Sequence, residues 1–238
     1  MSEFAVTEGL ARKVLDVVNV GLTNGLGDPE PGRMCVEAAV CFAMGLPHSD
    51  NPPCVGASVR RFKIRLNDAC WSSNQARTNG MRKLAIAQLG SDAIDQTAFR
   101  KIVAEQTIRQ IVPIALRAAA KRVPKHAKRL EAAAVRCEQE GTREAAQAAR
   151  NTANAAYAAA AAAAAADATA AAYAAAYAAA AAAAAADAAA AAAAAADAAA
   201  DAARDSVLNR SAEIGLAALI ELKSPGCEFL YLVDEVTA

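Results

Sequence analysis

Alanine occupies 42 of the 51 residues from Ala153 to Ala203. No glycine or proline interrupts the chain between Gly141 and Gly215. Alanine has the highest helix propensity because its side chain has no rotamers to lose, and about 12 to 15 such residues already give marginal helicity in water. This alanine tract is therefore predicted to be helical. Its methyl groups cannot transfer protons or bind metals, so the tract itself carries no chemistry.

The length of the tract leaves two shapes open, one rod or several packed helices. As a single helix, the 67 residues from Thr142 to Leu208 would span about 100 Å at 1.5 Å per residue. Tyrosine or aspartate recurs every ten residues, and ten residues advance a helix by about 280°, so this repeat does not stay on one face. Regular breaks, and hence two or three antiparallel helices, are the alternative. The repeating residues are Tyr157, Asp167, Tyr177, Asp187 and Asp197.

The second half of the tract has one face made only of alanine. From Thr169 onward, the larger residues fall inside an arc of about 160° on a helical wheel. Alanine surfaces let helix axes approach to the short end of the usual range of about 8 to 10 Å. This face is expected either to dock another chain or to pack inside the same bundle. The residues assigned to the interaction face are Ala182, Ala192, Tyr173 and Tyr177.

Glycine, proline and capping residues predict further helices outside the tract. Ser72 and Gln75 form a capping box, and Pro113 predicts a kink near Gln110 or a break into two helices. Pro225 is expected to end the last full helix, leaving a short strand or a helical turn after it. The expected helices are Ser2 to Val20, Arg33 to Met44, Val55 to Ala69, Ser72 to Gly90, Thr97 to Val123, Lys125 to Glu140 and Ser211 to Lys223.

The predicted fold is all-α, an antiparallel helical bundle with a long alanine-rich helical segment. Large apolar residues concentrate in Phe4 to Ile114 and in Val207 to Val236, so the two ends of the chain are expected to share a core. Three parts follow. They are a helical N-terminal body over 1–141, the alanine-rich segment over 142–208, and a C-terminal helix with a short tail over 209–238 that packs on the N-terminal body.

The tract is not expected to enter a membrane. Asp167, Asp187 and Asp197 interrupt it, and each would cost about 2.5 to 3.5 kcal/mol at the centre of a bilayer. The first residues, MSEFAVTEGLARKV, are acidic where a secretory signal has basic residues, and no continuous apolar run follows. A cytoplasmic location is therefore expected.

Basic residues are concentrated in one part of a chain whose total charge is balanced. Between Ser58 and Arg129 there are sixteen lysines and arginines against four acidic residues. Such an excess can bind the phosphates of a nucleic acid, although a solvated face or pairing with acidic segments explains it equally well. The candidate contacts are Arg60, Arg61, Lys63, Arg65, Lys121, Arg122, Lys125, Lys128 and Arg129.

Metal binding and catalysis find little support in the sequence. Cys35, Cys41, Cys54 and Cys70 lie close together, but their spacing lacks the tight pair of a structural zinc site, and buried cysteines commonly act as small apolar residues. The sequence has only two histidines and contains no phosphate-binding glycine loop and no hydrolase or zinc-protease motif. We therefore expect no catalytic residues, no metal and no cofactor.

Parts of the chain resemble bacterial or phage proteins. The segment ANAAYAAAAAAAAADATAAAYAAAYAAA resembles the alanine-rich helices of immunity proteins in bacterial polymorphic toxin systems, over about residues 153 to 205. Segments such as MCVEAAVCFAMGLPH resemble a bacterial or phage protein of unassigned role. The resemblance implies a protein that binds another protein. The sequence thus predicts a non-catalytic structural or interaction module, with a protein partner or a second copy of itself, and nucleic-acid association as the alternative.

Overall fold

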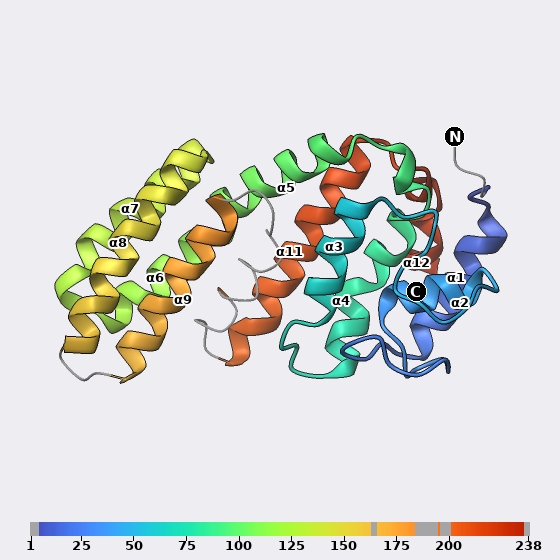
Figure 1. The fold of residues 1–238 in the computed structure, drawn as a ribbon, viewed down its shortest axis with the longest axis horizontal. Coiled ribbons are helices and arrows are strands. Elements are labelled where there is room, and N and C mark those ends of the chain that lie inside the picture. The colour runs from blue at the N-terminus through green and yellow to red at the C-terminus, as the bar shows by residue number, and fades with distance from the viewer. Residues whose placement is uncertain (1–4, 163–165, 184–194, 196–200, 236–238) are drawn as a thin grey trace. The chain divides into compact units, whose positions relative to one another are not determined.

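The computed structural model describes residues 5–162, 166–183, 195 and 201–235, and gives no side-chain detail for 166–168, 181–183, 201 and 202. Every secondary-structure element in these residues is a helix, which confirms the all-α prediction (Figure 1). Among the described residues no helix is long and apolar enough to cross a membrane. The chain forms two compact units, one from 1–100 with 212–238 and the other from 101–211.

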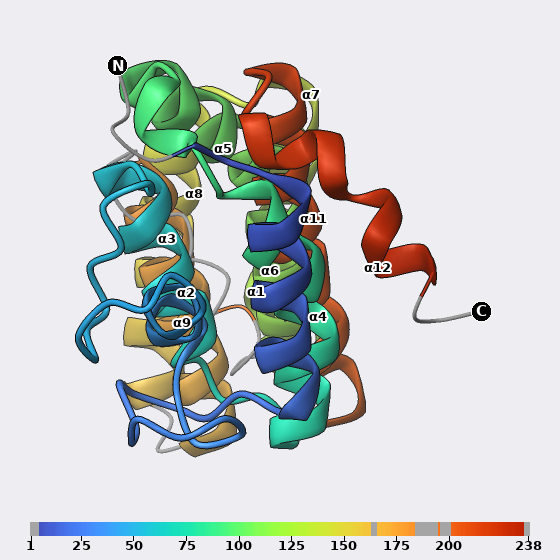
Figure 2. The ribbon, with the colours of Figure 1, turned by 90° about the vertical axis from the view of Figure 1, so that its right-hand side faces the viewer.

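Short helices build the first unit, which we call the terminal unit because it contains both ends of the chain. Helix α1 packs against α4 and α2 and also contacts α12, and α3 packs against α2 and α4 (Figure 2). Helix α5 begins in this unit, and α11 ends in it. Its helices are α1 (Glu8–Val20), α2 (Val36–Ala43), α3 (Ala57–Asn67), α4 (Asn74–Ala87) and α12 (Tyr231–Glu235), with 3-10 turns η1 (Ser91–Ala93) and η3 (Pro225–Phe229), together with the start of α5 (Gln96–Gln110) and the end of α11 (Asp201–Glu221).

The C-terminal tail packs on the end of α4. The Ser224 hydroxyl donates a hydrogen bond of 2.6 Å to the carbonyl oxygen of Ala87, and the Gly226 N–H donates one of 2.8 Å to that of Leu89. A side chain at position 226 would overlap the carbonyl oxygen of Ile86, so only glycine allows this approach. The tail that follows is helical, which resolves the sequence alternative of a strand or a helical turn.

The second unit is a four-helix arrangement. It contains α6 (Val112–Arg122), the 3-10 turn η2 (Pro124–His126), α7 (Ala127–Glu140), α8 (Arg143–Ala162) and α9 (Ala166–Ala183). Consecutive helices run in opposite directions and pack together, and α9 returns to contact α6 (Figure 1). The alanine tract is therefore not one rod, because α8 and α9 lie side by side. Residues 101–141 join the alanine helices rather than the N-terminal body.

Several helix ends differ from the expected ones. Helix α1 begins after Thr7, whose hydroxyl accepts a hydrogen bond from the Leu10 N–H at 3.2 Å, while the expected cap Ser2 lies outside the described residues. The prediction of a capping box at Ser72 is wrong by one residue, since the side chain of Ser73 caps α4 instead. The break at Pro113 is confirmed, because α5 ends at Gln110 and Pro113 lies in the first turn of α6, where its missing N–H costs nothing.

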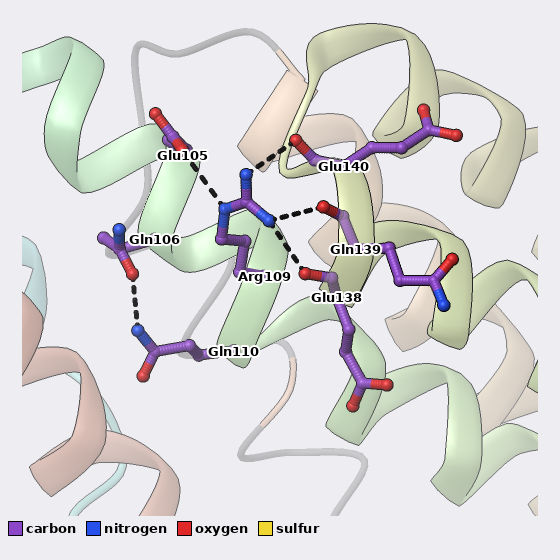
Figure 3. A network of polar contacts seen from close by, with 7 residues as sticks. All are labelled: Glu105, Gln106, Arg109, Gln110, Glu138, Gln139 and Glu140. Carbon is purple, nitrogen blue, oxygen red and sulfur yellow. Dashed lines mark hydrogen bonds and ion pairs between the residues drawn. The ribbon is translucent and has the colours of Figure 1, made fainter.

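Arg109 ties α5 to the end of α7 (Figure 3). Its guanidinium donates hydrogen bonds to the carbonyl oxygens of Glu138, Gln139 and Glu140, at 2.9, 2.7 and 2.9 Å. These carbonyls have no partners within the helix, so a cation at this end is favourable. Gly141 closes α7 with a φ of +63°, and a side chain there would overlap Arg109. This contact is structural and fixes the entry to the four-helix unit.

Candidate interaction surface

The alanine face predicted from the sequence packs inside the chain. Six alanines of α8 and six of α9 are buried, and they lie where these helices contact each other, α6 and α7. The buried set is Ala145, Ala146, Ala149, Ala153, Ala156, Ala160, Ala171, Ala172, Ala175, Ala176, Ala178 and Ala179. Of the two alanines assigned to docking, Ala182 belongs to α9 but its side chain is not described, and Ala192 lies outside the described residues.

Three tyrosines project from the same pair of helices. Tyr157, Tyr173 and Tyr177 are 39%, 59% and 48% exposed. Tyr173 and Tyr177 are one helical turn apart on α9, with stacked rings whose centroids lie 6.5 Å apart. Tyr157 of α8 reaches them across the helix pair, with its ring centroid 5.9 Å from that of Tyr173. We call these three residues the tyrosine surface.

The tyrosine surface has no charged residue beside it in the sequence. No lysine, arginine, aspartate or glutamate occurs from 151 to 166 or from 168 to 186. Exposed neighbours such as Ala155 and Ala158 are small, so the rings protrude from a surface of methyl groups. A protruding phenol offers an apolar ring and a hydroxyl that donates and accepts hydrogen bonds. The sequence predicts Tyr173 and Tyr177 as interaction residues, and Tyr157 joins them because α8 packs antiparallel to α9.

The four predicted nucleic-acid contacts on α3 differ in their exposure to solvent. On α3, Arg61 is exposed, while Arg60 and Arg65 are half-buried. Lys63 is fully buried beside Glu37, so its assignment as a nucleic-acid contact is wrong. A helical wheel explains this, because Lys63 shares the inward face of α3 with other buried residues.

The other five predicted nucleic-acid contacts form a basic cluster. Five exposed residues lie at the turn from α6 to α7, namely Lys121, Arg122, Lys125, Lys128 and Arg129. Among the described residues, no carboxylate forms an ion pair with the side chains of Lys121, Lys125, Lys128 or Arg129. This basic turn belongs to the four-helix unit, whereas α3 belongs to the terminal unit.

The cysteines are mostly buried in the terminal unit. Cys35, Cys41 and Cys54 are buried and Cys70 is exposed, all as free thiols. Burial raises the pKa of Cys41 to about 11, which keeps its thiol protonated at neutral pH. Cys35 instead caps α2, with its sulfur accepting a hydrogen bond from the Ala38 N–H at 3.4 Å. In the described part of the chain, no three cysteine, histidine or acidic side chains are placed to hold a metal ion.

Comparison of the chain with protein-family models, with curated proteins and with solved structures finds no match.

Proposed function

We propose that the protein is a non-catalytic interaction module that binds a protein partner through the tyrosine surface. The observation that supports this proposal is the cluster of three exposed tyrosines, in which the ring of Tyr173 lies near those of Tyr157 and Tyr177 on two alanine-rich helices. Aromatic residues are enriched at the centres of protein interfaces. Aromatic residues make up only 4% of the chain, yet three of its four tyrosines lie together on the surface, where they contribute little to its own core.

The packed helices beneath the tyrosines hold the rings in position before a partner binds. Tyrosine loses only two side-chain torsions on binding, and its ring can cover a large apolar area of a partner. The buried alanines bring α8 and α9 close together and so hold Tyr157 against Tyr173. Such a preformed surface has little conformational entropy left to lose on binding. The absence of charged residues from 151–166 and 168–186 favours a partner whose matching surface is apolar or hydrogen-bonding.

Removing the tyrosine surface should abolish binding without unfolding the protein. We expect the affinity of the triple variant Tyr157→Ala, Tyr173→Ala, Tyr177→Ala for its partner to fall by about a hundredfold or more. Tyrosines at the centre of an interface can contribute about 2 kcal/mol each. Far-ultraviolet circular dichroism should be unchanged, because alanine suits a helix.

The measurement is affinity capture from the cells that produce the protein, with the bound proteins quantified by mass spectrometry. Tyr231→Ala is the matched control, because Tyr231 is also 45% exposed but lies in the terminal unit. The proposal requires at least one protein that the parent and the control retain and the triple variant loses. Equal recovery of every protein with all three forms would contradict it.

Nucleic-acid binding is the second candidate, and the exposed basic turn supports it. Removing three of its charges in Lys125→Ala, Lys128→Ala, Arg129→Ala should lower the slope of log affinity for DNA against log salt by about 2 to 3, because each phosphate contact releases a counterion. Arg60→Ala with Arg61→Ala is the control on α3. Retention on heparin over a salt series measures the slope. No retention of the parent at low salt would rule out this candidate.

A further inference from the structure

The terminal unit contains a buried ion pair that lacks hydrogen bonds. Glu37 on α2 and Lys63 on α3 have fully buried side chains, and Lys63 Nζ lies 3.3 Å from Glu37 Oε1. Neither carboxylate oxygen accepts a hydrogen bond within the described residues, and Nζ donates none. A buried carboxylate normally accepts several, so the free Oε2 of Glu37 calls for a partner that the chain itself does not provide.

A small cavity lies against Glu37. It has a volume of about 30 Å³, and its lining includes the acidic residues Glu37, Asp50 and Asp68. Glu37 is buried while Asp50 and Asp68 are exposed, so the lining of the cavity includes acidic residues on the surface and one in the interior. One water needs about 10 to 15 Å³ of such volume, and the cavity therefore accepts about two non-hydrogen atoms. Lys63 does not line it, so its lining carries no positive side chain.

The rim of the cavity is held in place by backbone contacts. Asp68 Oδ1 accepts hydrogen bonds from the Gly25 N–H at 2.8 Å and from Asn67 Nδ2 at 2.9 Å. Asn67 Oδ1 in turn accepts one from the Val36 N–H at 3.4 Å. The rim thus joins the loop before α2 to the end of α3. A cavity fixed in this way has its charges in position before a ligand arrives.

The charge and size of the cavity define its ligand. Among the described residues, no three cysteine, histidine or acidic side chains are placed to hold a metal ion, which favours a cation that binds by donating hydrogen bonds. A primary ammonium donates three. Leu26, Val36 and Ile64 also line the cavity and can contact the first carbon of an alkyl chain. We propose that this cavity binds the ammonium group of a small primary amine, with Glu37 as its innermost acceptor and Asp50 and Asp68 at its entrance.

The test is a thermal melt of the full chain in methylammonium chloride, compared with tetramethylammonium chloride and sodium chloride at the same ionic strength. Methylammonium should raise Tm in a saturable way, by about 3 °C at a tenfold excess over Kd. Tetramethylammonium is too large for the cavity and donates no hydrogen bond, so it should behave like sodium. Equal shifts in all three salts, or none, would show that the cavity holds only water and would overturn the proposal.

Variants link the effect to the carboxylates. Asp50→Asn should weaken methylammonium binding about fivefold, measured as the ligand-induced shift from the variant's own melt without ligand. Glu37→Gln should abolish the shift. If Glu37→Gln does not fold, Asp50→Asn decides the question, and an unchanged affinity in that variant would contradict the assignment. The tyrosine surface takes no part in this experiment, so its outcome is independent of the proposed function.

Discussion

Lys63→Met should lower the free energy of unfolding by about 3 to 5 kcal/mol, because it leaves the buried charge of Glu37 without its partner. The methionine fills a similar volume, so the loss arises from the unpaired carboxylate rather than from a cavity. Urea unfolding followed by circular dichroism measures the change. A loss below about 1 kcal/mol would mean that Glu37 does not depend on Lys63.

A double variant is the control for this loss. Glu37→Leu combined with Lys63→Met replaces the whole pair by apolar side chains, which is often neutral or stabilising. The double variant should therefore regain most of the stability that Lys63→Met alone loses. If both forms are equally unstable, packing at position 63 and not charge pairing explains the result.

The stability deficit of Lys63→Met should depend on pH. Burial raises the pKa of Glu37 above its ordinary value of 4.5, and Lys63 opposes that rise. Without Lys63, the folded-state pKa rises further, so the folded protein retains a proton that the unfolded chain releases. The deficit relative to the parent should be smallest below pH 4.5 and should grow as the pH rises toward 7.

Ala156→Leu should destabilise the protein by about 1 to 3 kcal/mol, because Ala156 is fully buried in α8 and leucine adds three carbon atoms. Its neighbour Ala155 is exposed, so Ala155→Leu is the matched control and should change stability by only a few tenths of a kcal/mol. Thermal melts compare the two variants. Equal melts for both would place Ala156 in solvent and contradict the packing of α8.

The same melts show whether the alanine face packs within one chain or forms a contact between two chains. The described alanines pack within one chain, so the loss in Ala156→Leu should not depend on protein concentration. A loss that shrinks as the concentration rises would instead indicate a contact between copies.

Helix content could be predicted from the sequence because alanine propensity and local caps act over a few residues. The return of α8 against α9 stayed one of two alternatives, since no glycine or proline marks a turn between Gly141 and Gly215. The contact between Tyr157 and Tyr173 depends on that return and could not be predicted from the sequence. Tertiary packing, not propensity, decides these features.

The sequence contains a signal for the buried pair of Glu37 and Lys63, but a count of basic residues does not reveal it. Lys63 lies four residues after Val59 and three before Leu66, which places it on the apolar face of α3. Glu37 is the one charged residue in the apolar segment VEAAVCFA. Two opposite charges on the inward faces of two neighbouring helices predict a buried pair, but only once those helices are known to be neighbours.

The interaction role of the tyrosine surface is the central claim, and site-specific photo-crosslinking tests it most directly. A benzophenone amino acid replaces Tyr173 in one form of the protein and Tyr231 in another, and both are irradiated in the cells that produce them. We expect a crosslink at position 173 to one protein, either another chain or a second copy, that position 231 does not form. No crosslink at position 173, or the same products from both positions, would contradict it.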